Sequence, residues 1–299
     1  MTVIMRSKDS VLFITVDSCR YDTFKWAYKK GLLKNIRGVG PLYKAYSPSY
    51  FTYGSHASFW MGFLPGVIGS KESILNPKAG KLFRMNHTPA VKNEETKNFV
   101  LDGENIIDGF NRRGYVTIGT GAVEWFNDNT KTGGQLSKDF KHYMFAGDTF
   151  SLEKQLYWID SKLKEISEEQ EVFTFINIGE THVPYWHNGA KWDKWPSPCI
   201  PFGGKECSAK MSRLRQRKCI EWIDTKLENL ILSFMNSTII ICADHGDCWG
   251  EDGLWEHGIS HKYTLEVPLV MRIKGNELKQ SKTRPSILND MLTKMKERG

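Results

Sequence analysis

The chain has 299 residues, of which 40% are hydrophobic and 25% charged, which is ordinary for a globular protein with a buried core. Its 41 basic and 34 acidic residues give a formal net charge of +7, which mildly favours anionic ligands. The basic residues are scattered, and the densest group, residues 205–218, is mixed with Ser, Met and Leu. This pattern argues against a continuous nucleic-acid-binding track and favours a solvated face.

The N-terminal residues show no long apolar segment followed by a small-residue cleavage site, so no signal peptide is predicted. No run approaches the roughly 18 apolar residues that a membrane span needs. The six cysteines include no CxxC pair and are most simply free thiols in a reducing compartment. We therefore expect a cytoplasmic location and no membrane span.

A first strand is predicted over residues 11–16, because this run is apolar and rich in β-branched side chains. It ends at Asp17, and the large side chains between Tyr21 and Lys30 have the spacing of a helix. An acid in this position binds a metal or substrate in some proteins and merely caps the following helix in others. Taken alone, Asp17 more often has the structural role.

A Ser/Pro-rich loop in residues 41–51 leads to a short apolar helix that is predicted to end at Gly62 and Pro65. Thr52 is expected just before this helix, where backbone N–H groups and the helix dipole favour an anion. That setting stabilises an alkoxide or an attacked phosphoryl group. In isolation, a simple helix cap is the more common role for such a hydroxyl.

The middle of the chain continues the alternation of helices and strands. Two segments between these elements are predicted to be lid-like insertions, because 70–104 is rich in Lys, Asn, Pro and Glu and 186–210 in Pro, Gly and Trp. Glu180 and His182 follow a buried strand. The predicted helices cover residues 105–113, 152–166 and 213–234, and the predicted strands cover 114–121 and 172–178.

Residues 238–269 carry the most specific local signal. A buried strand around residues 239–241 ends in Asp244 and His245, and ligand sites of open α/β sheets lie at this end of their strands. Gly246 allows a close backbone approach. His257 and His261 follow, before another strand at 267–269. This stretch predicts half of a metal site.

Strands that alternate with helices predict an α/β fold, a three-layer α/β/α sandwich with a largely parallel central sheet. We expect residues 1–299 to form a single catalytic domain.

Several segments resemble, in order, motifs of the alkaline phosphatase superfamily and of its sulfatase-like branch. The resemblance covers roughly residues 11–273, and the order and spacing of the motifs are more specific than any single motif. The matching segments are Val16–Asp22, Tyr46–Pro65, Asn111–Gly119, Thr181–Tyr185, and Ala243–Gly246 with Gly253–Gly258 and Val267–Leu269.

Counting back from Gly62 and Pro65 places Thr52 at the nucleophile position of this family. Sulfatases proper have there a Cys or Ser within Cys/Ser-x-Pro-x-Arg, which is oxidised to formylglycine. Threonine is a secondary alcohol and cannot give that aldehyde, and the Pro and Arg are absent as well. The resemblance therefore implies a threonine that attacks phosphorus, as in phosphodiesterase and phosphotransferase members, and not a formylglycine sulfatase.

The resemblance also implies one metal ion, held by Asp17, Thr52, Asp244 and His245. Three oxygen ligands and one imidazole suit zinc or manganese better than calcium, which prefers oxygen-only shells.

Three further residues fall where relatives contact the anion or a second metal: Glu180, His182 and His257. The Asp-x-x-x-His pattern typical of relatives with two metals is missing, so a second metal stays open and His182 is an alternative substrate contact. His261 is expected to be structural. Weaker candidates for anion contacts, each of which more often has a structural role, are Arg20, His56 and His187.

The resulting hypothesis is a metal-dependent phosphohydrolase, a phosphodiesterase or phosphomonoesterase, that acts on a small anionic phosphate ester through a phospho-threonine at Thr52. His257 or His182 would neutralise the leaving oxygen. The alternatives are a biosynthetic phosphotransferase, a catalytically idle metal-binding module, and a nuclease. The nuclease has weak support from the Trp-rich residues 186–195 and the basic group at 205–218.

Overall fold

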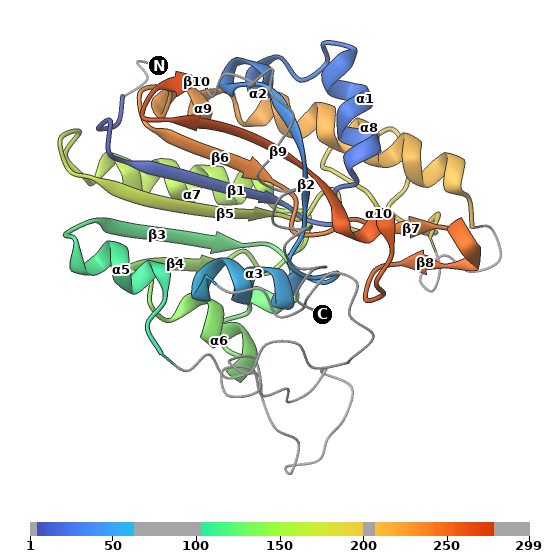
Figure 1. Ribbon diagram of the computed structural model, residues 1–299, viewed down its shortest axis with the longest axis horizontal. Coiled ribbons are helices and arrows are strands. Elements are labelled where there is room, and N and C mark those ends of the chain that lie inside the picture. The colour runs from blue at the N-terminus through green and yellow to red at the C-terminus, as the bar shows by residue number, and fades with distance from the viewer. Residues whose placement is uncertain (1–4, 63–102, 200–206, 278–299) are drawn as a thin grey trace, which may run out of the picture.

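The computed structural model describes residues 5–62, 103–199 and 207–277 (Figure 1). The predicted insertion at 70–104 lies almost entirely outside the described residues, as does Pro65. Of the second predicted insertion, 186–210, the part at 200–206 lies outside them too.

An eight-stranded sheet forms the centre of the fold (Figure 1). Strands β6, β1, β5, β3 and β4 lie side by side and parallel, whereas β9 runs antiparallel to β6, and both β2 and β10 run antiparallel to β9. The predicted α/β class and largely parallel sheet are therefore confirmed. The strands are β1 Val11–Val16, β2 Leu42–Tyr46, β3 Val116–Gly121, β4 His142–Phe145, β5 Val172–Ile178, β6 Thr238–Cys242, β9 Glu266–Ile273 and β10 Asn276–Glu277.

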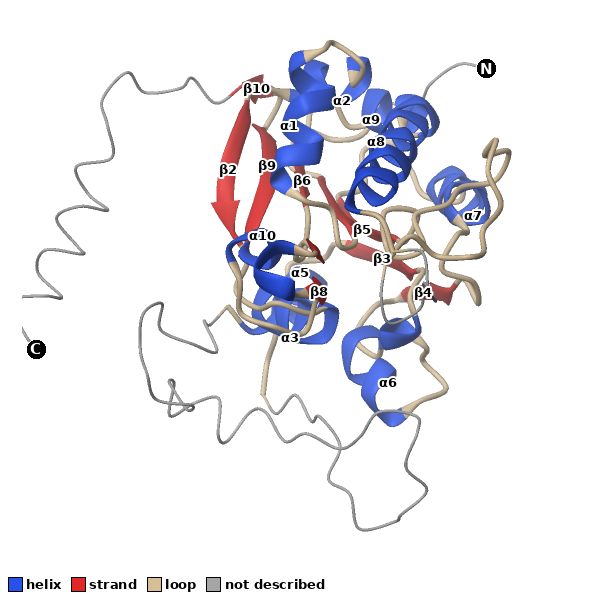
Figure 2. Ribbon diagram, turned by 90° about the vertical axis from the view of Figure 1, so that its right-hand side faces the viewer, coloured by secondary structure: helices blue, strands red, loops and turns tan. Residues whose placement is uncertain are grey.

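Helices cover both faces of the sheet (Figure 2). One group consists of α1 Tyr21–Lys29, α2 Lys34–Val39, α7 Leu152–Lys164, α8 Ala209–Lys226 and α9 Glu228–Ser233. The other consists of α3 Thr52–Met61, α5 Ile106–Arg112 and α6 Lys131–Ser137. Between β6 and β9 the chain forms a short hairpin and a one-turn helix. The hairpin consists of β7 Cys248–Trp249 and β8 Trp255–Glu256, and the helix is α10 Lys262–Leu265.

The alternation of side chains along the strands gives the two faces different cores. On β1, Leu12 and Ile14 point into a core of mainly aliphatic side chains, whereas Phe13 packs on the opposite side. On β5, Ile176 joins the aliphatic core and Phe175 the second one, which is built mainly from Phe, Tyr and Trp rings. We refer to these sides as the aliphatic face and the aromatic face.

Two sequence predictions differ from the structure in detail. The single helix expected over 213–234 is two helices, α8 and α9, which meet at Leu227. Residues 42–46, expected to be loop, form strand β2 and pair with β9. Strand β2 lies at the sheet edge and is only partly buried, so its sequence lacks the continuous apolar run of the central strands. Across the described ranges, no helix is both long and apolar enough to cross a membrane.

Candidate active site

The carboxyl ends of two neighbouring parallel strands and the start of one helix meet at a single point. Strands β1 and β6 pair in register up to Thr15 and Cys242, so the residues just after them, Asp17 and Asp244, lie at the same edge of the sheet. Thr52 is the first residue of α3, which packs on the aromatic face. Parallel pairing thus brings together side chains that are far apart in the sequence.

The four residues implied as metal ligands form one compact group. The Thr52 hydroxyl oxygen lies 3.4 Å from Oδ2 of Asp17 and 3.2 Å from Nε2 of His245. The same His245 nitrogen is 3.5 Å from Oδ2 of Asp244 and 3.8 Å from Oδ1 of Asp17. Asp17, Asp244 and His245 are completely buried. Their ligand atoms lie within 4.8 Å of one another, close enough to bind one ion.

The two carboxylate oxygens of Asp244 differ: Oδ1 is hydrogen-bonded, whereas Oδ2 has no hydrogen-bond partner. Its Oδ1 accepts hydrogen bonds from the backbone N–H groups of Ser18 and His245, at 3.1 and 2.9 Å. Its backbone carbonyl accepts from the hydroxyls of Ser47 and Ser55, which belong to the Ser/Pro loop and to α3. Its Oδ2 is buried without any hydrogen-bond partner. A buried carboxylate oxygen in this state is costly unless a cation neutralises it.

The charges of the group support the same conclusion. Burial, and then the neighbouring charge of Asp17, raise the pKa of Asp244 well above its ordinary value. Burial would also raise the pKa of Asp17, but the imidazoles of His182 and His245 and the amide of Asn177 outweigh it, so its pKa is lowered. Burial lowers the pKa of His245 to about 3, which keeps its ring neutral. Two opposed carboxylates, a hydroxyl and a neutral imidazole fit a divalent cation.

Asp17 is supported from the neighbouring strand and from the loop after it. The side-chain amide of Asn177, near the end of β5, donates to Oδ2 of Asp17 at 3.1 Å. The hydroxyl of Thr181 donates to the Asp17 carbonyl at 2.6 Å. On the other side, the predicted close approach at Gly246 is present: a Cβ there would lie 2.2 Å from the carbonyl oxygen of Tyr263.

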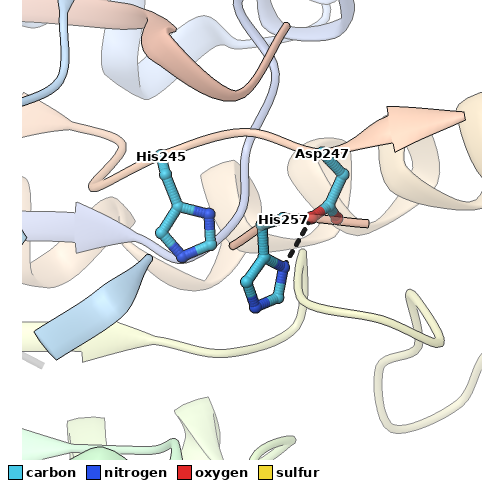
Figure 3. A group of neighbouring side chains, drawn as sticks. All are labelled: His245, Asp247 and His257. Carbon is cyan, nitrogen blue, oxygen red and sulfur yellow. Dashed lines mark hydrogen bonds and ion pairs between the residues drawn. The ribbon is translucent and has the colours of Figure 1, made fainter. Parts of the chain in front are cut away.

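A second group of possible ligands adjoins the first: His245, Asp247 and His257 (Figure 3). Asp247 precedes β7 and His257 follows β8, so the hairpin places them side by side. Nδ1 of His257 donates to Oδ1 of Asp247 at 2.8 Å. Burial would lower the pKa of His257, but the hydrogen bond and charge of Asp247 outweigh it and raise that pKa.

His182 lies beside these histidines, at the partly exposed side of the group. Its ring centroid is 5.2 Å from that of His257, and the rings of His245 and His257 are 4.4 Å apart. Nδ1 of His182 bonds to the carbonyl of Val183 at 2.9 Å, which leaves Nε2 as the ring nitrogen available to a ligand. The three histidines therefore line one side of the Thr52 group.

Glu180 is not brought into either group. Its Oε1 accepts from the backbone N–H of Leu152 at 2.8 Å, at the first residue of α7. The side chain is completely buried, and burial raises its pKa to about 8. Glu180 follows β5 with the same alternation as Ile176 and Ile178, so it is directed to the helices of the aliphatic face. A role as metal ligand is not supported by this placement.

The structure gives the three weaker anion-contact candidates other partners. The buried guanidinium of Arg20 pairs with Asp22 and Glu251, at 2.9 and 2.7 Å. His56 is buried with Nε2 3.0 Å from the Thr15 hydroxyl. His187 stacks on Trp222, with ring centroids 4.9 Å apart. His261, expected to be structural, caps α10 by accepting the Tyr263 N–H.

Sequence reasoning missed Asp247 and Asn177. Asp247 lies three positions after Asp244 and is as deeply buried, so the run Asp-His-Gly-Asp was its visible signal. Asn177 lies near the carboxyl end of β5, a completely buried strand whose other residues are apolar except for Thr174. A polar amide in that position was the visible signal.

Neither a protein-family model nor a curated protein sequence matches the chain. Solved structures do match, 264 chains in all, and phosphoethanolamine transferases recur among them. The C-terminal periplasmic domain of EptC from Escherichia coli, solved in complex with zinc, matches at 9% identity with a TM-score of 0.56, over 89% of this chain and 73% of that one.

Two other matches extend the comparison. The 2-O GAG sulfatase BT1596 matches at 15% identity with a TM-score of 0.61, over 93% of this chain and 66% of that one. A protein in the alkaline phosphatase superfamily from Vibrio parahaemolyticus matches at 11% identity with a TM-score of 0.53, over 91% and 62%. The cytoplasmic location of this chain stays a prediction, whereas the matched EptC domain is periplasmic. The chain therefore has the fold of the alkaline phosphatase superfamily.

Proposed function

We propose that the chain is a metal-dependent phosphotransferase that moves a phospho-group from a phosphate diester to an acceptor alcohol through a phospho-threonine at Thr52. The observation that carries the proposal is the position of the Thr52 hydroxyl, 3.4 Å from Asp17 and 3.2 Å from His245, at the first turn of α3. The transferases among the structures of like fold favour transfer to an acceptor molecule over transfer to water. Hydrolysis shares the first step and is the competing outcome.

The metal ligands in this proposal are Asp17, Thr52, Asp244 and His245, which fit a zinc or manganese ion by their donor atoms and by the unpartnered Oδ2 of Asp244. A bound divalent ion would lower the pKa of the Thr52 hydroxyl and polarise the phosphoryl oxygen. Asp17, which is buried and anchored by Asn177, also helps to fix the position of the Thr52 hydroxyl. Asp244 holds the start of α3 through its backbone carbonyl, which accepts from Ser55.

The start of α3 offers a second means of stabilising the anion. Helix α3 has 10 residues, and the first N–H groups of a helix have no partners within it. These donors and the helix dipole favour negative charge next to Thr52. Gly54 lies in this first turn, where a Cβ would be 2.4 Å from Oγ of Ser49, so the Ser/Pro loop packs directly against the helix start.

The proposed reaction has two displacement steps. In the first, Thr52 releases its hydroxyl proton to solvent and its oxygen bonds to phosphorus. At the same time the bond between phosphorus and the leaving oxygen breaks, and the leaving oxygen takes up a proton to become an alcohol. In the second, the acceptor alcohol loses its proton, its oxygen bonds to phosphorus, and the bond between phosphorus and Thr52 breaks. In this scheme His257 or His182 contacts the leaving and incoming oxygens, and both rings are partly exposed.

The test compares Thr52→Ala with wild type on aryl phosphodiesters and monoesters, in zinc or manganese, with and without an added primary alcohol. We expect Thr52→Ala to lose activity by roughly 1,000-fold or more, the scale at which removal of a nucleophile acts. Thr52→Ser keeps a hydroxyl and should retain part of the activity. Mass spectrometry of quenched wild-type enzyme should find phosphate on the peptide that contains Thr52.

Thr130→Ala is the matched control, because Thr130 is also a threonine at a helix start but caps α6, outside the site. It should cost about 1 kcal/mol of stability and no activity. Wild-type turnover in Thr52→Ala would refute the nucleophile. Phosphate release that is unaffected by the added alcohol would replace the transferase with a hydrolase, and a protein that binds no metal and has no esterase activity would favour the idle module.

A further inference from the structure

A chain of hydrogen bonds runs from the protein interior to one histidine of the site. Asp247 is completely buried, and its two carboxylate oxygens have different partners. Oδ1 accepts from Nδ1 of His257 at 2.8 Å, and Oδ2 accepts from the hydroxyl of Tyr185 at 2.7 Å. The Tyr185 oxygen in turn accepts from the indole N–H of Trp249 at 2.8 Å. Tyr185 is therefore itself held in place, and both Tyr185 and Trp249 are buried.

The neighbouring histidine lacks this support. His182 lies beside His257, with ring centroids 5.2 Å apart, but its Nδ1 bonds to the backbone carbonyl of Val183. A backbone carbonyl orients a ring, but it carries no charge to stabilise an imidazolium that forms during a reaction. A buried carboxylate does both. The two histidines are thus not equivalent, although both line the same side of the site.

The hairpin fixes the direction of the His257 ring. Asp247 comes immediately before β7 and His257 immediately after β8, and Cys248 pairs with Glu256 between them. Because Nδ1 of His257 is bonded to Asp247, its Nε2 is the nitrogen on the opposite side of the ring (Figure 3). The ring centroid is 4.4 Å from that of His245, whose own Nε2 is 3.2 Å from the Thr52 hydroxyl.

We infer that Asp247 is the positioning residue of the site: it holds His257, and not His182, as the residue whose Nε2 exchanges a proton with the leaving and incoming oxygens. Tyr185 and Trp249 hold Asp247 in turn. The inference rests on the proposed phosphoryl transfer at Thr52. In the first step, the proton on Nε2 passes to the leaving oxygen as its bond to phosphorus breaks. In the second, the acceptor hydroxyl returns a proton to Nε2 as its oxygen bonds to phosphorus.

The rival interpretation is a second metal held by His245, Asp247 and His257, whose ligand atoms lie within 4.8 Å of one another. The contacts of His245 argue against it. Its Nδ1 is 3.1 Å from the carbonyl of Gly246, and its Nε2 faces Thr52, so neither nitrogen is left over for another ion. The Asp247–His257 hydrogen bond would also have to be replaced.

The kinetic test is Asp247→Asn in the full chain with zinc or manganese, on phosphodiesters that share one phospho-group and differ in the leaving alcohol. We expect kcat to fall about 10- to 100-fold for alkyl leaving groups, the range of a lost orienting carboxylate, with KM changed less than about two-fold. With p-nitrophenol, a leaving group that needs little protonation, the loss should be much smaller. Tyr185→Phe should give the same pattern at lower amplitude, because the Asp247–His257 bond remains.

The chain offers a matched control. Oδ2 of Asp252 lies 3.2 Å from Nε2 of His261, so these residues form a second aspartate–histidine pair on the same segment. In this pair the histidine caps α10 and the carboxylate is mainly exposed. Asp252→Asn should therefore leave kcat and KM unchanged for every leaving group. The metal content of Asp247→Asn, measured on the purified protein, should equal that of wild type.

A readout independent of activity separates this inference from the proposed function. In ¹⁵N-histidine NMR, His257 should show a proton on Nδ1 in wild type and in Thr52→Ala, and a mixture of tautomers in Asp247→Asn. An unchanged His257 signal in Asp247→Asn overturns the inference, as does a kcat loss equal for all leaving groups. Loss of a metal equivalent replaces it with the second metal site. If Thr52→Ala is fully active, the proposed function fails, and the NMR result alone decides whether Asp247 positions His257.

Discussion

The two faces of the sheet end differently at the edge that carries the site. On the aliphatic face, strands β1 and β5 end in apolar residues, Val16 and Ile178. On the aromatic face, the same two strands end in polar residues, Thr15 and Asn177, and the next position of that alternation is Asp17. Helix α3, which carries Thr52, packs on this second face.

His56 shows how the aromatic core and the site are joined. Its ring lies among aromatic rings, 4.8 Å from Phe126 and 5.7 Å from Phe175. Its nitrogens bond outward, Nε2 with the Thr15 hydroxyl at 3.0 Å and Nδ1 with the Thr52 carbonyl at 2.7 Å. Burial lowers the pKa of His56 to about 4, so the ring is neutral. The aromatic core therefore both stabilises the fold and contacts residues of the site through His56, whereas we assign the aliphatic core a role in stability alone.

The largest expected effect compares adjacent residues on opposite faces. Phe175→Ala should cost about 3–5 kcal/mol of unfolding free energy and Ile176→Ala about 2–5 kcal/mol, because both are completely buried. Among the folded molecules, only Phe175→Ala should lower kcat, since its cavity lies against the His56 ring. Urea unfolding and activity assays at low temperature measure the two quantities. An equal kcat loss in both variants would contradict the assigned difference between the two faces.

The second prediction concerns the buried acid at the aliphatic end, Glu180. Its pKa, raised to about 8 by burial, exceeds the ordinary 4.5, so the folded state retains a proton that the unfolded chain releases. Stability from this group is complete below about pH 4.5 and is lost as the pH rises to about 8, on the order of 3–5 kcal/mol in total.

Glu180→Gln should flatten this decline, and it keeps an oxygen for the Leu152 N–H. Urea unfolding at a series of pH values is the measurement, with kcat at pH 7 as the control for a role outside the site. A steep decline that persists in Glu180→Gln would assign it to another group, and a large fall in kcat would return Glu180 to the site.

The third and smallest effect is that of metal removal at the polar end of the aromatic face. Zinc at about 100 times its Kd should stabilise the protein by about 2.7 kcal/mol, seen as a higher Tm that a chelator reverses. Asp244→Asn should abolish this gain. Without metal, however, the variant should melt no lower than wild type, because it removes one of two opposed buried carboxylates. A zinc response that is retained in Asp244→Asn would contradict the assigned ligand set.

The sequence allowed prediction of the central strands and the fold class, because β1, β5 and β6 are apolar runs whose buried faces leave a clear pattern. Strands β2 and β4 were missed, since their partly buried side chains give no such pattern. Thr52, Asp17, Asp244 and His245 were named through motif order, and the structure brings them together.

The partners of individual polar residues could not be predicted. Arg20 and His56 were candidates for anion contacts, yet the carboxylate of Glu251 and the hydroxyl of Thr15 occupy them. Periodicity reports which residues are buried, whereas these pairings depend on how distant segments pack. The same limit hid Asp247, whose role depends on a hairpin that closes ten residues later at His257.

Arg20 links the β7–β8 hairpin to the rest of the fold. Its guanidinium lies between the rings of Trp249 and Tyr263, 4.2 and 3.9 Å from their centroids, and also donates to the Asp247 carbonyl at 3.2 Å. A hairpin of two-residue strands would fray on its own. Here, swinging it outward would strip a buried cation of most of its neighbours. These contacts tie the hairpin to the segment just after the first strand, and so they help to set the distance between the Thr52 group and His257.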